Sequence, residues 1–148
     1  MIVAVGTDHA GFSLKPSVVE AIRRAGHEVL DVGAYAVDQN DDYPDFAAAV
    51  ARAVIDRRAE RGVILCGSGV GASVAANKFA GIRSALCHDT FSARQGVEDD
   101  AMNVLTLGAR VIGPSLAAEL VRVFLAATFS DAERHRRRLE KVKAFERQ

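Results

Sequence analysis

Short apolar runs alternate along the chain with longer segments in which apolar residues recur at helical spacing. The runs predict strands at 2–5, about 28–32, 62–65, 82–87 and about 104–107. The segments between them predict helices at about 13–25, 43–61 and 72–79, between the last two strands, at about 114–128 and at about 131–146. This alternation is typical of a parallel sheet with helices on both faces. We therefore expect an α/β protein, a Rossmann-like three-layer sandwich with a five-stranded parallel sheet flanked by helices.

Local chemistry sets several of these boundaries. Gly26 is expected to end the first helix and Gly62 the second, because glycine is common just past a helix C-terminus. Pro44 suits the first turn of the second helix. Ser130 or Asp131 is expected to cap the last helix. No repeat or low-complexity linker interrupts the 148 residues, so we expect one domain spanning 1–148.

Polar and reactive residues follow three of the predicted strands directly. They are Asp8, His9, Cys66, Ser68, His88 and Asp89. Right-handed crossovers bring the carboxyl ends of parallel strands to one edge of the sheet, where ligands gather. The pattern therefore predicts a single site at that edge.

The third predicted strand leads into Cys66-Gly67-Ser68-Gly69-Val70-Gly71, a thiol followed at once by three glycines. Backbone N–H groups at the start of the next helix can stabilise a phosphate, an enolate oxygen or a thiolate, so Cys66 should ionise more readily than a free cysteine. A glycine turn that binds nothing, with Cys66 as a small core residue, is the alternative. The glycine spacing matches neither a Walker A loop nor the dinucleotide fingerprint, so no nucleotide cofactor is expected.

The composition excludes several classes of partner. The chain has 49% hydrophobic and 26% charged residues, as soluble proteins do, and no apolar stretch long enough to cross a membrane. Lysine plus arginine equals aspartate plus glutamate at 19 each, so no overall field attracts nucleic acid or an anionic membrane. The N-terminal sequence lacks a basic leader, which predicts a cytoplasmic protein in which Cys66 and Cys87 are reduced.

Positive charge is concentrated in Arg134-His135-Arg136-Arg137-Arg138. Such a run is either a solvated helix face, supported by neighbouring glutamates, or an anion site, because arginines bind phosphate through bidentate contacts. Arg134 and Arg138 are four residues apart, so a helix places both on one face where they can close on one anion. The residues alone leave both interpretations open.

Longer motifs occur in order along the chain. They are Asp8-His9-Ala10-Gly11-Phe12, Tyr43-Pro44-Asp45-Phe46, the Cys66 loop, Ala76-Asn77-Lys78-Phe79-Ala80-Gly81-Ile82-Arg83, and the segment from Asn103 to Gly113. Together they resemble the B-type ribose-5-phosphate isomerases, within the family that also contains galactose-6-phosphate and allose-6-phosphate isomerases. The match runs in register from Ile2 to about Arg138, so the resemblance covers nearly the whole chain.

The resemblance implies a metal-free aldose–ketose isomerase that needs no cofactor and works through a cis-enediol. In the family a cysteine at the position of Cys66 takes the proton from the carbon next to the carbonyl. The enediolate oxygen would be stabilised by the backbone of Gly67, Gly69, Val70 and Gly71 together with the Ser68 hydroxyl.

The resemblance also implies the substrate-binding residues. The phosphate would be held by His9, Arg110, Arg134 and Arg138, and the sugar contacted or enclosed by Tyr43, Asn77, Lys78 and Asp100. In the family the C-terminal arginines reach a partner subunit's site. We therefore expect an obligate homodimer, with a dimer of dimers as the alternative assembly and with the helix at about 131–146 reaching the partner. Arg136 and Arg137 are expected at the surface.

One position departs from the family pattern. A histidine usually assists opening of the furanose ring together with an aspartate at the position of Asp8, and Asp99 occupies that histidine's place. An aspartate can accept a proton from a sugar hydroxyl but is a weak donor at neutral pH. Ring opening could therefore be slower, fall to Asp8 and a water, use His88, or be unnecessary for an open-chain substrate.

Two classes of function stay open at this point. The first is an isomerase, with ribose 5-phosphate and ribulose 5-phosphate as the default pair and allose 6-phosphate, galactose 6-phosphate or a tetrose phosphate as alternatives. The second is a non-catalytic sugar-phosphate-binding protein that has lost a proton-transfer residue at Asp99. Cys66 favours catalysis, because a pure binding site has no use for a thiolate.

Overall fold

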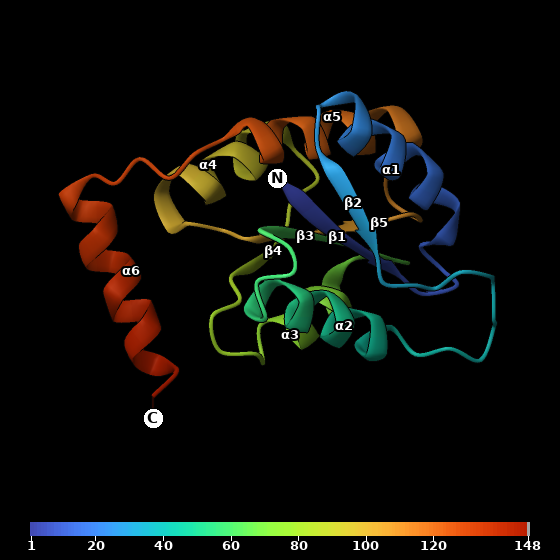
Figure 1. The fold of residues 1–148 in the computed structure, drawn as a ribbon, viewed down its shortest axis with the longest axis horizontal. Coiled ribbons are helices and arrows are strands. Elements are labelled where there is room, and N and C mark those ends of the chain that lie inside the picture. The colour runs from blue at the N-terminus through green and yellow to red at the C-terminus, as the bar shows by residue number, and fades with distance from the viewer. Residues whose placement is uncertain (148) are drawn as a thin grey trace.

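Five strands form a single sheet in the computed structural model, which describes residues 1–147 (Figure 1). Residue 148, the last of the predicted domain, lies outside the described residues. The strands are β1 (Ile2–Thr7), β2 (Glu28–Asp31), β3 (Arg61–Cys66), β4 (Ser84–Leu86) and β5 (Val104–Gly108). Their order is β2-β1-β3-β5-β4, and every neighbouring pair is parallel. The predicted α/β fold with a five-stranded parallel sheet is confirmed.

Helices cover both faces of the sheet (Figure 1). One layer consists of the 3-10 turn η1 (Phe12–Leu14), α1 (Lys15–Arg24), α4 (Thr90–Asp100) and α5 (Pro114–Ala126). The other layer consists of α2 (Tyr43–Ile55) and α3 (Val70–Ala76). The last helix, α6 (Glu133–Phe145), lies to one side next to α4 instead of on a sheet face (Figure 1). Within residues 1–147 no helix is both long and apolar enough to span a membrane.

Alternation along β3 shows how the two core layers are built. Val63 and Leu65 belong to the core under α1, α4 and α5, whereas Ile64 and Cys66 belong to the core under α2 and α3. Successive side chains of a strand point to opposite faces of the sheet, so a buried strand supplies both layers. Cys66 is therefore the last residue of a central strand and lies on the α2–α3 face.

The second helix ends at Ile55, so its predicted extension to 61 is wrong. Arg57 adopts a left-handed φ of 59°, which a continuing helix cannot contain. Arg61 instead begins β3, where it is paired with Val3 of β1. The N–H of Arg58 donates to the Ala53 carbonyl at 2.9 Å, which closes the helix in a turn that helix propensity alone does not predict.

Several other boundaries differ from those expected. Helix α3 begins at Val70 and ends at Ala76, because Gly69 already serves as its N-cap. Strand β4 covers only Ser84–Leu86. Helix α6 begins at Glu133 with Ala132 as N-cap and no side-chain cap, so neither residue proposed as its cap has that role.

Candidate active site

The loops that follow β1, β3 and β5 meet in a cavity of about 330 Å³ at the carboxyl edge of the sheet, which we call the Cys66 cavity. Helices α2 and α3 add residues to it. The predicted site residues that line it are Asp8, His9, Tyr43, Cys66, Gly67, Ser68, Gly71 and Arg110. Ala10 and Val111 complete the lining. One chain thus brings together the residues after β1 and β3 with an arginine after β5.

Cys66 lines this cavity although the residue is only 5% exposed. Its sulfur accepts a hydrogen bond from the backbone N–H of Gly69, with N and Sγ 3.0 Å apart. Gly69 turns its N–H back toward the sulfur at a φ of 85°, in the left-handed region that favours glycine. The Ser68 hydroxyl accepts the N–H of Val70 at 3.2 Å. A backbone N–H so close to the sulfur can stabilise negative charge there.

Tyr43 and Arg110 flank the glycine loop. The Tyr43 ring packs so closely on Gly71 that a Cβ at that position would lie 2.7 Å from the ring Cζ. The backbone N–H of Arg110 donates to the Gly67 carbonyl at 3.0 Å, which ties the loop after β5 to the loop after β3. The loop therefore has the Tyr43 ring beside Gly71 and the Arg110 side chain beside Gly67.

Asp41, which sequence reasoning missed, holds His9. Its Oδ1 accepts the backbone N–H of His9 at 3.0 Å and lies 2.6 Å from the ring Nδ1. Because a carboxylate only accepts hydrogen bonds, Nδ1 carries a proton and Nε2 is the ring nitrogen left for a ligand. No sequence signal marks Asp41, because it lies in a polar loop 32 residues from its partner.

Asp8, His9 and Asp41 form the one cluster within residues 1–147 whose possible metal-ligand atoms all lie within 4.8 Å of one another. Two of these atoms already have protein partners. His9 Nδ1 contacts Asp41, and Asp8 Oδ1 accepts the N–H of Gly11 at 2.9 Å. The cluster is therefore suited to hydrogen bonding with a polar ligand.

The residues after β4 do not line the Cys66 cavity, so the expectation that His88 and Asp89 share that site is wrong. His88 Nε2 accepts the backbone N–H of Gly108 at 3.0 Å, and burial lowers the pKa of His88. Asp89 caps α4 by accepting the N–H of Ser92 at 2.7 Å, which lowers the pKa of Asp89. The physical reason is sheet order, since β5 separates β4 from β3.

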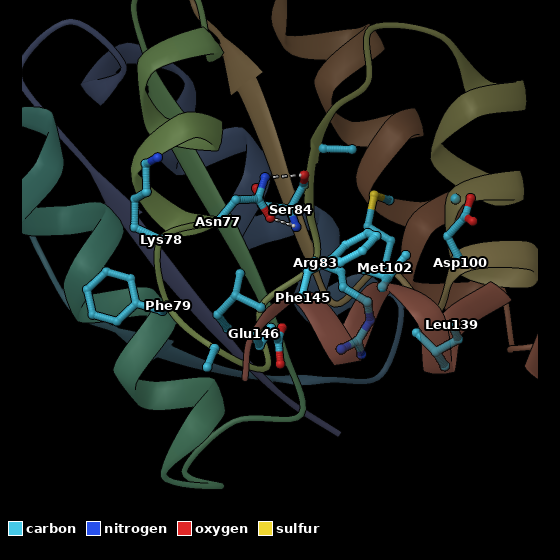
Figure 2. A pocket seen from close by; sticks show the side chains of 15 residues that line it. Asn77, Lys78, Phe79, Arg83, Ser84, Asp100, Met102, Leu139, Phe145 and Glu146 are labelled. Carbon is cyan, nitrogen blue, oxygen red and sulfur yellow. Dashed lines mark hydrogen bonds between the residues drawn. The ribbon is translucent and has the colours of Figure 1, made fainter. Parts of the chain in front are cut away.

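Asn77, Lys78 and Asp100 line a second, larger cavity of about 620 Å³ between α6 and the β4 edge (Figure 2). The Asn77 side chain accepts the Ser84 N–H and donates to the Ser84 carbonyl, both at 2.8 Å, and so joins the end of α3 to β4. Much of the remaining lining is apolar and consists of Phe79, Ala80, Ile82, Ala85, Met102, Leu139, Val142 and Phe145. These three predicted residues therefore do not line the Cys66 cavity of their own chain.

Asp99, Arg134 and Arg138 line neither of these cavities and belong to α4 and α6. Asp99 instead contacts His135, which is only 3% exposed. Sequence reasoning gave His135 no role, and its one signal was its place between arginines in the basic run from Arg134 to Arg138. Arg136 and Arg137 are exposed, as expected.

Comparison with known proteins finds relatives over nearly the whole chain. The profile of a family described as Ribose/Galactose Isomerase matches residues 3–142. Ribose-5-phosphate isomerase B of Escherichia coli (strain K12) is 41% identical, over 97% of this chain and 95% of that protein. D-erythrulose-4-phosphate isomerase of Pectobacterium atrosepticum is 41% identical, over 86% of this chain and 84% of that protein. The solved structure of the Trypanosoma brucei type B ribose 5-phosphate isomerase matches with a TM-score of 0.94 at 42% identity, covering 97% of both chains.

Proposed function

Because this chain belongs to the ribose/galactose isomerase family and is a sugar-phosphate aldose–ketose isomerase, we propose that it interconverts ribose 5-phosphate and ribulose 5-phosphate with Cys66 as the base. The observation that carries this proposal is the Cys66 sulfur, which receives the Gly69 N–H and lines one cavity with Asp8, His9 and Arg110. That cavity offers a base, donors for an oxyanion and two groups suited to a phosphate. The scheme needs no cofactor.

The proposed chemistry moves one proton between two neighbouring carbons. The Cys66 thiolate takes the proton from C2 of the open-chain aldose, and the freed electron pair forms the C1–C2 double bond while the developing charge on O1 is neutralised by a proton from the Ser68 hydroxyl. The enediol then gives its O2 proton back to the Ser68 oxygen as the C2 carbonyl forms, and the Cys66 thiol gives its proton to C1. Proton and electron counts are unchanged over the cycle. The oxyanion is stabilised by the Ser68 hydroxyl and the backbone of Gly67, Gly69, Val70 and Gly71, while Asp8 assists ring opening.

In the proposed complex the substrate phosphate lies at the end of the sugar away from C1 and C2. His9 offers Nε2 because Asp41 occupies Nδ1, and Arg110 offers a guanidinium beside the glycine loop. Tyr43 contacts the sugar between these two ends. Arg134 and Arg138, which this chain does not bring to its own cavity, would come from a second copy.

A homodimer is proposed because one chain leaves an apolar surface uncovered. Val142 is 47% and Phe145 68% exposed on α6, beside the larger cavity (Figure 2). Strand β4 is the last in the sheet, so its outer edge has no strand partner within residues 1–147. A second copy related by a twofold axis would cover this surface and carry its Arg134 and Arg138 to the Cys66 cavity.

Three of the proposed substrate-binding residues depend on this assembly. Asn77, Lys78 and Asp100 line the larger cavity, so they would contact the substrate only in the dimer.

The cytoplasm is the proposed location of the protein. Cys66 and Cys87 are both free thiols, and cysteines stay reduced in that compartment.

A tetrose phosphate is the second candidate substrate. Asp99 stands where the family's ring-opening histidine is expected and contacts His135, and one relative is named for a tetrose phosphate. A tetrose 4-phosphate cannot close a furanose ring, because its terminal hydroxyl carries the phosphate. Assays of kcat/KM with ribose 5-phosphate, allose 6-phosphate, galactose 6-phosphate and erythrose 4-phosphate decide between them. We expect the highest value with ribose 5-phosphate, and a higher value with erythrose 4-phosphate would replace that assignment by the tetrose.

A further inference from the structure

A series of polar contacts joins α4 to α6. Gln95 Nε2 donates to Asp99 Oδ2 at 2.6 Å. Asp99 Oδ1 lies 3.4 Å from His135 Nδ1, and Ser130 Oγ lies 2.6 Å from the same nitrogen. On the other side of the ring, Arg134 donates its Nε–H to His135 Nε2 at 3.1 Å. We call these five residues the α4–α6 cluster, and none of them lines the Cys66 cavity.

The contacts determine which ring nitrogen of His135 carries the proton. A guanidinium is always protonated and can only donate, so His135 Nε2 must accept from Arg134. The ring proton is then on Nδ1, where it faces the Ser130 hydroxyl and the Asp99 carboxylate. His135 is thus a neutral imidazole whose Nδ1–H faces Asp99 and whose Nε2 accepts from Arg134, so it links the two side chains.

The same contacts leave part of Arg134 available. Its Nε is bonded to a nearly fully buried ring, which fixes the plane of the guanidinium. Within the described chain its two Nη groups have no hydrogen-bonded protein partner. Two parallel N–H donors of that kind match the oxygens of a phosphate.

We propose that Asp99 is a positioning residue, which acts through His135 to aim the Arg134 guanidinium at the substrate phosphate. The proposal rests on the proposed phosphate role of Arg134, and it assigns Asp99 a task that does not involve the sugar ring. Because all five residues belong to one chain, the α4–α6 cluster stays together whichever subunit's site Arg134 serves. Without the Asp99 charge the imidazole is held less firmly, and Arg134 loses more conformational freedom when it binds a phosphate.

Asp99→Asn tests this because it keeps the shape of the side chain and removes its charge. We expect KM for ribose 5-phosphate and for erythrose 4-phosphate to rise about 3- to 10-fold, with kcat changed less than about twofold. The dissociation constant of inorganic phosphate, measured by calorimetry, should rise by the same factor. Ser130→Ala, which removes the shorter contact to Nδ1, should act in the same direction.

Two further variants provide the controls. In an Arg134→Ala background, Asp99→Asn should add nothing to the loss of phosphate affinity, because the group that it positions is gone. Glu98→Gln makes the same charge change on the neighbouring residue of α4, whose carboxylate lies 3.8 Å from Arg94. It should leave KM, kcat and phosphate affinity unchanged.

The outcomes separate positioning from ring opening. A fall in kcat with ribose 5-phosphate that spares erythrose 4-phosphate would show that Asp99 acts on the ring, and would overturn the proposal. An equal loss of phosphate affinity in the Arg134→Ala background would show a general structural role and overturn it too. Asp99→His should raise KM for both ribose 5-phosphate and erythrose 4-phosphate. A ring-opening role of Asp99 predicts instead a higher kcat with ribose 5-phosphate alone.

Two measurements remain valid if other assignments fail. Phosphate calorimetry does not depend on which sugar is the substrate, so it tests Asp99 even if ribose 5-phosphate is not isomerised. Long-range ¹H–¹⁵N correlation spectra of the wild-type protein report the His135 tautomer without any variant. A proton on Nδ1 is expected, and a proton on Nε2 would overturn the proposal.

Discussion

The Cys66 cavity and the α4–α6 cluster are assembled in different ways. The cavity is formed by loops that follow neighbouring parallel strands, so the hydrogen bonds of the sheet hold its residues in register. The cluster joins two helices at the side of the molecule through side-chain contacts, and one of these helices does not lie on the sheet (Figure 1). Under the proposed function, the residues of the chemical step would all come from one chain, whereas Arg134 and Arg138 would reach a substrate phosphate only in the site of a partner subunit.

The largest effect is expected from replacing Cys66, the proposed base. Cys66→Ala should lower kcat by about 100-fold or more, the contribution typical of a lost general base, and leave phosphate affinity within about twofold. Cys87→Ala is the matched control, because Cys87 lies in the core on the other face of the sheet and should keep activity. Steady-state kinetics with phosphate calorimetry measure both. Retention of more than about a tenth of the wild-type rate by Cys66→Ala would exclude Cys66 as the base.

The next largest effect is expected from replacing Arg138 on α6. Arg138→Ala should raise KM roughly 10- to 100-fold by removing charge-assisted bonds to the phosphate, with a smaller change in kcat. Arg137→Ala, one residue away and exposed, should leave KM unchanged.

Mixing Arg138→Ala with Cys66→Ala asks whether the two regions belong to different subunits. Hybrid dimers should regain activity, because one of their two sites then has both an intact Cys66 and an intact Arg138. No recovery after confirmed subunit exchange would mean that α6 serves the site of its own chain.

A smaller effect is expected from the residue that holds His9. Asp41→Ala should raise KM about 3- to 10-fold and leave kcat nearly unchanged, because the His9 ring loses the carboxylate that fixes its tautomer. Asp42→Ala removes an exposed neighbour that makes no side-chain cap to α2, and should have no effect. A kcat loss larger than the KM change would instead place His9 in the proton transfers.

The smallest effect concerns stability and the second thiol. Burial raises the pKa of Cys87 to about 11, with a further contribution from Asp89. The unfolded chain ionises this thiol at lower pH than the folded protein, so this contribution to stability is lost as pH rises through about 9 to 11. Thermal unfolding at pH 8 and pH 10.5 should show a larger decrease for wild type than for Cys87→Ala. Equal decreases would mean that folding does not raise the pKa of Cys87.

Much of the fold and part of the site could be predicted from the sequence. The apolar runs located all five strands, and the residues after β1 and β3 gathered as expected at one edge. His88 and Asp89 follow a strand at the same edge but do not line the Cys66 cavity. The local pattern of a strand end does not reveal that β4 is an edge strand, because sheet order depends on the crossovers of the whole chain.

The sequence by itself determined the order in which strands and helices follow one another along the chain. It also determined the Cys66 loop with its glycines and the family to which the chain belongs. These are local properties, because periodicity, turn chemistry and motif spacing involve residues close together along the chain. Only the tertiary structure decided which side chains meet. It paired His9 with Asp41 and Asp99 with His135, and it separated Arg134 from the Cys66 cavity. Contacts of this kind join segments far apart in the sequence, so they exist only once the sheet has set the positions of the loops and helices.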